Sequence, residues 1–191
     1  MDKSRLEAFS DGVIAVIITI MVLELKPPHG SDMAELLPLL PIFLTYVLSF
    51  IFVGIYWVNH HHFFQAIDHV SGGMLWANNH LLFWLSLVPF TTAWMGENHF
   101  TTWPVLLYAI NLLACALSYT VMTMVTVREH GPDSAIAKAI GEDRKGIISL
   151  AFYVAAIPLA FFSPAASCAC FVIVALIWLV PDKRIERVVA K

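Results

Sequence analysis

The chain has 191 residues, of which 59% are hydrophobic and only 13% are charged, and its formal net charge is −3. Soluble domains are nearer to half apolar and a quarter charged, so this composition and the mean hydropathy of +0.77 exclude a soluble globular protein and indicate a polytopic membrane protein. The length predicts one membrane domain over residues 1–191. We expect no nucleic-acid partner.

The first apolar stretch follows directly on two polar residues, Ser10 and Asp11. Residues 12–23 are then apolar except for Thr19. At a rise of about 1.5 Å per residue, residues 5–25 would form a helix roughly 30 Å long, which matches the hydrocarbon thickness of a bilayer. We therefore predict the first membrane-spanning helix here, and an all-α protein built around it.

Five more apolar stretches follow along the chain. The complete set of predicted spans is about 8–25, 36–58, 74–95, 103–127, 147–162 and 165–180. The last two are short, and by length alone they could be two spans or one broken hairpin.

The positions of the basic residues decide between these alternatives. Lys and Arg are retained on the cytoplasmic side of membranes. Of the eleven basic residues, only Lys26 falls in a loop of the opposite side if there are six spans. The others form three groups, before the first span, between the fourth and fifth, and after the sixth: Lys3 and Arg5; Arg128, Lys138, Arg144 and Lys145; Lys183, Arg184, Arg187 and Lys191. Six spans with both termini cytoplasmic place all three groups on one face.

Polar side chains gather at the cytoplasmic ends of the first three predicted spans. An ionised carboxylate such as Asp11 is costly near the membrane unless it is paired, and Arg5 lies too far round the same helix to pair with it. Partners should therefore come from the neighbouring spans. The expected network comprises Arg5, Ser10, Asp11, Trp57, His60 and Asn78. We interpret it as a structural clamp between helices, with a proton-transfer or metal site as the alternative.

The three consecutive histidines at 60–62 do not by themselves predict a metal site. Adjacent residues on a helix point about 100° apart, whereas zinc ligands on one helix are usually separated by four positions. The sequence contains no HExxH, GxSxG or P-loop pattern and no TVGYG-type filter. We therefore expect neither an enzyme nor a bound cofactor or metal.

The first span carries a stripe of residues that share one side of the helix. On a helical wheel, Val16, Thr19, Ile20 and Leu23 lie within about 100° of each other, and Gly12 lies on the same stripe. By spacing alone such a stripe is typical of packing against a neighbouring helix.

The motif Arg5-x-x-x-Phe9-Ser10-Asp11-Gly12, with the apolar run behind it, resembles the first-helix signature of the transmembrane protein 175 family of potassium channels. Phe9 joins the polar network as part of this motif. Two further matches follow in the same order as in the family: Trp57-x-x-His60 with Phe64, and Asn78 with Pro89-Phe90. The resemblance covers about residues 5–90, which is three of the six predicted spans.

The resemblance implies a prokaryotic homotetramer in the plasma membrane, with a pore lined by the first helices. It assigns Val16 to the narrowest ring, Thr19 to a threonine layer one turn further out, and Ile20 and Leu23 to the outer lining. The family usually has isoleucine or leucine at position 16, so valine predicts a wider ring. Glu24 would lie at the external mouth, where it could concentrate cations or be a solvated charge at the helix end.

The leading hypothesis is therefore a potassium-permeable channel, with other monovalent cations as further candidates. One alternative is a proton-coupled secondary transporter in which Asp11 and His60 titrate. The other is a membrane enzyme or metal-binding protein that uses the histidine cluster.

Overall fold

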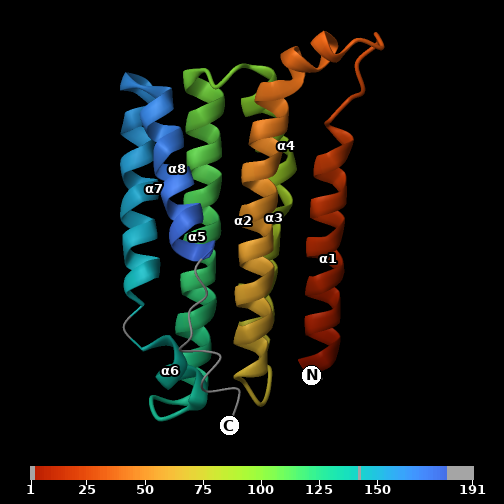
Figure 1. Ribbon diagram of the computed structural model, residues 1–191. Helices are drawn as coiled ribbons and strands as arrows, with labels where there is room; N and C mark the ends of the chain where they lie inside the picture. The colour runs from red at the N-terminus through yellow and green to blue at the C-terminus, as the bar shows by residue number, and fades with distance from the viewer. Residues whose placement is uncertain (1–2, 142, 180–191) are drawn as a thin grey trace.

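The computed structural model describes residues 3–141 and 143–179, and this part of the chain consists of helices joined by short loops. The elements in order are α1 (Lys3–Leu23), the short 3₁₀ helix η1 (Met33–Leu39), α2 (Leu40–Gln65), α3 (Gly72–Ser86), α4 (Val88–Glu97), α5 (Thr102–His130), α6 (Ala135–Ile140), α7 (Arg144–Phe162) and α8 (Pro164–Leu179). They form an all-α bundle in which the long helices run side by side (Figure 1).

Four stretches of the described residues are long and apolar enough to cross a membrane: α1, η1 with α2, α5, and α7. Helix α8 is equally apolar but shorter. The protein is therefore a multi-pass membrane protein. The basic cluster of the C-terminal segment, Lys183, Arg184, Arg187 and Lys191, lies outside the described residues.

The segment predicted as one span over 74–95 contains two helices, α3 and α4. The break lies at Leu87, and Pro89 follows two positions later, at the second position of α4. Proline has no N–H to donate and its ring clashes with the preceding turn, so a continuous helix cannot pass through this point without a kink. Proline is favoured in the first turn of a helix, which is where the chain places it.

Buried polar side chains lie beside this break. The Thr92 hydroxyl donates a hydrogen bond to Ser49 Oγ of α2 at 2.7 Å, and Ser49 and Tyr108 Oη of α5 are 2.9 Å apart. Asn111 of α5 donates to Thr91 Oγ1 at 3.3 Å. Hydrogen bonds of this kind hold helices together where no water is available. They fix α4 against α2 and α5 just beyond the point where α3 ends.

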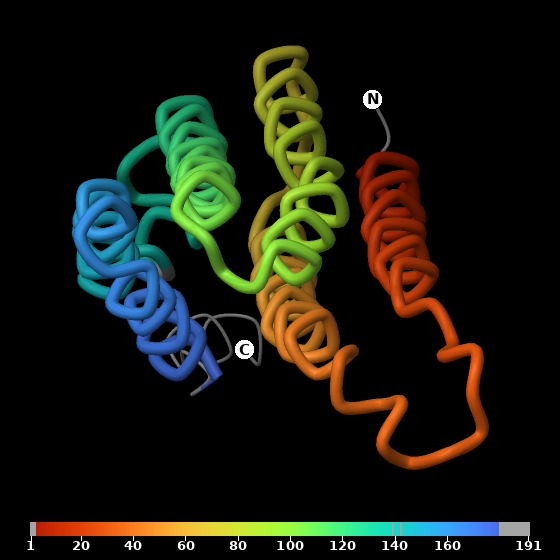
Figure 2. The backbone as a smooth tube through the Cα atoms, turned by 90° about the horizontal axis from the view of Figure 1, so that it is seen from above, coloured from red at the N-terminus to blue at the C-terminus, as the bar shows by residue number. Residues whose placement is uncertain are grey.

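Helix α1 lies at one edge of the bundle, and α7 and α8 lie at the other (Figures 1 and 2). Its buried side packs on α2, α3 and α4. Ile14, Ile17 and Met21 fill this contact. The opposite side of α1 has no helix of the described chain against it, and this exposed side leads to the candidate site.

Candidate functional site

The exposed side of α1 is as apolar as its buried side. Val16, Ile20 and Leu23 are 54%, 44% and 72% exposed, whereas Ile14 on the buried side is 1% exposed. These three residues repeat at intervals of four and three positions, so they form a continuous stripe along the helix. Phe9 lies on the same side and is also exposed.

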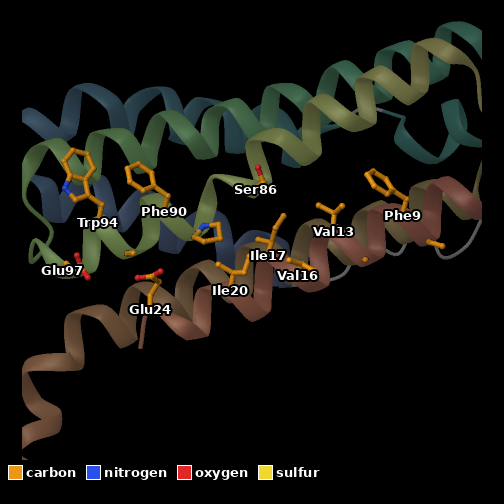
Figure 3. A pocket seen from close by; sticks show the side chains of 14 residues that line it. Phe9, Val13, Val16, Ile17, Ile20, Glu24, Ser86, Phe90, Trp94 and Glu97 are labelled. Carbon is orange, nitrogen blue, oxygen red and sulfur yellow. The ribbon is translucent and has the colours of Figure 1, made fainter. Parts of the chain in front are cut away.

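A groove of about 960 Å³ runs between α1 and the α3–α4 segment, and we call it the α1–α4 groove. Val16 and Ile20 line it from α1, and Phe90 and Trp94 line it from α4 (Figure 3). Its walls are therefore mainly apolar. Glu24 and Glu97 lie together at one end, and Phe9 lies near the other.

Thr19 is exposed on α1 between the residues of the stripe. Its hydroxyl donates to the backbone carbonyl of Val16 at 2.9 Å, within its own helix. This bond uses the hydroxyl proton but leaves lone pairs of the oxygen available to accept a hydrogen bond or to contact a cation. Thr19 thus presents a hydroxyl oxygen on an otherwise apolar surface.

A chain of buried hydrogen bonds joins α1, α2 and α3 at the end of the bundle where α1 begins. Asn78 donates through Nδ2 to Ser10 Oγ at 2.9 Å, and Ser10 donates to the carbonyl of Leu6 at 2.9 Å. The other Asn78 atom, Oδ1, lies 2.7 Å from His60 Nε2. Since Oδ1 can only accept, His60 must carry its proton on Nε2, and its buried Nδ1 has no partner. The chain of hydrogen bonds contains no carboxylate or ammonium group, and it acts as a clamp between α1, α2 and α3.

Asp11 belongs to a separate contact near this clamp. Its carboxylate accepts a hydrogen bond from Trp57 Nε1 at 3.0 Å. Among the described residues, no hydrogen bond or ion pair joins Arg5 to Asp11, and Arg5 is exposed. Phe9 lies in the α1–α4 groove and not among the hydrogen bonds. The structure therefore brings together Ser10, His60 and Asn78 in one group and Asp11 with Trp57 in another.

The three consecutive histidines point to different surroundings. His60 is fully buried in the clamp, His61 Nδ1 lies 3.2 Å from Glu7 Oε1, and His62 borders another groove between α1, α2 and α8. Within the described part of the chain, no three His, Cys, Asp or Glu side chains are grouped so that they could hold a metal ion.

Three residues that line the groove were not predicted as site residues from the sequence: Phe90, Trp94 and Glu97. All three come from α4, and the fold brings them opposite the exposed stripe of α1. A signal for Phe90 existed in the Pro89-Phe90 pair, but only the packing of α4 beside α1 shows that this pair lines a groove. The Glu7–His61 pair was missed as well, because it joins the first turns of α1 to a surface residue of α2.

Comparisons with known proteins agree with this architecture. Residues 5–89 match the family model described as the endosomal/lysosomal potassium channel TMEM175. The chain is 55% identical to a potassium channel of Chryseobacterium sp. (strain P1-3) over 187 residues, which cover 98% of this chain and 97% of the relative. It is also 34% identical over 86 residues to the human endosomal/lysosomal proton channel TMEM175, which covers 39% of this chain and 17% of the human protein.

The fold is matched by a solved structure as well. The crystal structure of a lysosomal potassium-selective channel TMEM175 homolog from Chamaesiphon minutus superposes with a TM-score of 0.78 at 31% identity, and the match covers 93% of this chain and 96% of that one. The chain therefore belongs to the TMEM175 family, whose members are ion channels and not enzymes.

Proposed function

We propose that the protein is a potassium-permeable channel that conducts through the centre of a homotetramer. The observation that carries this proposal is the exposed apolar stripe of α1, which has no partner helix within the described chain and borders the α1–α4 groove. Four copies around one axis would turn these stripes toward a shared conduit. The names of the bacterial relatives support potassium as the permeant ion.

The residues of the stripe suggest how such a conduit would work. A ring of four Val16 side chains forms a hydrophobic constriction, and pores of this kind gate by excluding water from the narrow section. Thr19 would add a layer of hydroxyl oxygens one turn further along, where they replace part of an ion's hydration shell. Ile20 and Leu23 would continue the apolar lining, and Glu24 would raise the local concentration of cations at the mouth.

The proposed subunit has six spans, and α3 with α4 makes one broken span over residues 72–97. The described basic residues support an orientation with the amino-terminal end of the bundle in the cytoplasm. Six of them lie at that end, in the first turn of α1 and between the end of α5 and the start of α7, whereas Lys26 lies at the other end. In a prokaryotic cell the protein would reside in the plasma membrane.

A proton-coupled transporter is not favoured. A transporter usually places its titrating residues in a central cavity near the bilayer midplane. Asp11 and His60 make separate contacts at one end of the bundle, and His60 is enclosed between helices. The name of the human relative, a proton channel, makes protons a permeant ion to be measured beside potassium and sodium.

The direct test is ion flux into liposomes that contain the purified protein. Under a potassium gradient, we expect potassium flux that exceeds sodium flux and persists after treatment with a chelator. A membrane-impermeant organic cation in place of potassium should abolish it. Liposomes that show no cation flux beyond that of protein-free vesicles would overturn the proposal. Flux that requires a proton gradient would point to the transporter instead.

A further inference from the structure

The outer end of the α1–α4 groove carries two carboxylates on different helices. Glu24 follows the last turn of α1, Glu97 ends α4, and both side chains line the same groove (Figure 3). Within the described residues, no hydrogen bond or ion pair engages either carboxylate. Two like charges at one end of an apolar groove repel each other, and a cation between them would relieve this repulsion.

Among the described residues, one strongly basic side chain lies at this level. Lys26 lies two positions after Glu24 and is exposed. No carboxylate of the described residues lies within 4 Å of its ammonium group. The segment between α1 and η1 swings outward from the bundle beside the ends of α1 and α2 (Figures 1 and 2). Lys26 belongs to this outward segment and does not line the groove of its own subunit.

Rotational symmetry would place Lys26 at the same membrane depth as the two carboxylates of a neighbouring subunit. Rotation about an axis perpendicular to the membrane keeps each residue at its own depth, so Lys26 of one subunit lies at the level of Glu24 and Glu97 of the next. A ring of four subunits also requires a head-to-tail interface, in which two different surfaces of the chain meet. A cation on one surface and two carboxylates on the other give such an interface complementary charge.

Whatever packs in the α1–α4 groove can come close to the backbone of α1. Gly12 lines the groove, and a Cβ atom built on it meets nothing within 4 Å inside the subunit. A glycine inside a helix costs roughly 1 kcal/mol relative to alanine, so the subunit alone gives no reason for it. Glycine is enriched where two membrane helices come into close contact. Phe90, 61% exposed on the opposite wall, offers a large side chain to the same occupant.

We propose that α1 of the neighbouring subunit packs against the α4 wall of the α1–α4 groove, beside the stripe that faces the pore, and that Lys26 of that neighbour pairs with Glu97 and Glu24 at the outer end. This inference deepens the proposed function and rests on its tetramer. The pair would close the ring of subunits at the external mouth. It would also offset part of the negative charge of Glu24. The electrostatic potential at the external mouth would therefore depend on whether this pair between subunits is formed.

Cross-linking tests the geometry. Lys26→Cys and Glu97→Cys are combined in one chain with Cys168→Ser, since the other two native cysteines are buried. A short bismaleimide reagent is used because paired Lys and Glu backbones are too far apart for a disulfide. We expect covalent dimers, trimers and tetramers on a denaturing gel. Each single cysteine variant serves as a control and should give covalent dimers at most on the same gel.

Charge reversal tests the energetics. Lys26→Glu or Glu97→Lys alone should lower the tetramer fraction in detergent several-fold, and the double variant should restore it. Suppose that the unmodified protein is a tetramer, that cross-linking gives no product above the dimer, and that the double variant has no larger tetramer fraction than the single variants. The ion pair is then refuted, while the channel proposal stands. If the unmodified protein is not a tetramer, the proposed function fails first.

Discussion

Val16 is the residue on which the proposed conduction mechanism depends most. It is half-exposed on α1, borders the α1–α4 groove and lies one turn from the Thr19 hydroxyl. Its side chain is one methylene shorter than the isoleucine or leucine expected at a tight ring. The size of this side chain should therefore control how easily water and ions cross the narrow section.

Val16→Ala should widen the constriction. We expect a several-fold larger single-channel conductance in planar bilayers and a lower ratio of potassium to sodium permeability. Val22→Ala is the matched control, because Val22 is also exposed on α1, at 45% against 54% for Val16, but lies about 120° round the helix from Val16. Equal currents from Val16→Ala and the unmodified protein would remove Val16 from the constriction.

Ser10 gives a second prediction at the scale of single residues. Ser10→Ala leaves the Nδ2 group of Asn78 buried without its acceptor, so the free energy of unfolding should fall by about 1 kcal/mol. Thermal denaturation of the detergent-solubilised protein measures this loss. Ser86→Ala is the control, since the Ser86 hydroxyl is exposed and bonds only to its own helix. Ion selectivity should not change in Ser10→Ala, and a selective loss of potassium preference in this variant would contradict the clamp role.

At the scale of elements, the close contact between α4 and α2 has a strict steric requirement. A Cβ atom added at Gly96 would lie 2.6 Å from Thr45 Oγ1 and 2.8 Å from the Cα atom of Ile42. A backbone atom of the neighbouring helix cannot move aside as a flexible side chain can. The glycine therefore sets how near α4 comes to α2, and with it the position of the groove wall.

Gly96→Ala should destabilise the protein by about 1–3 kcal/mol, as overpacking in a tight contact does. Gly54→Ala in α2 is the control, because a Cβ there meets nothing within 4 Å. Unfolding in a graded series of denaturing detergent compares the two variants with the unmodified protein. A Gly96→Ala protein as stable as the Gly54→Ala protein would show that α2 and α4 do not approach as closely as described.

The elements themselves were largely accessible from the sequence, because the apolar stretches are long and the loops between them are short and polar. The break at Leu87 was harder to predict. Pro89 is compatible either with a kinked helix or with two helices, and only the hydrogen bonds from Ser49, Tyr108 and Asn111 decide where α4 sits. These three polar residues lie inside apolar stretches of the sequence, but nothing in their spacing identifies their partners.

At the scale of the whole molecule, the sequence likewise did not show which residues of different helices meet at the candidate site. A stripe on α1, and a polar network with Ser10, His60 and Asn78 among its members, followed as predictions from helical periodicity and from the order of the spans. Phe90, Trp94 and Glu97 did not, because a groove between two helices depends on their tertiary packing. Phe9 was placed in the polar network by its motif and Arg5 by its position at the cytoplasmic end of the first span, whereas the structure leaves both outside its hydrogen bonds.

The central claim concerns the whole assembly: the exposed stripe of α1 faces a water-accessible conduit in the assembled channel. Reaction of Val16→Cys with a small, positively charged methanethiosulfonate reagent tests it most directly, with currents recorded in planar bilayers. The account predicts that the reagent blocks current through Val16→Cys and leaves Val22→Cys and the unmodified protein unchanged. Block of Val22→Cys with no effect on Val16→Cys would contradict it, because a different side of α1 would then line the pore.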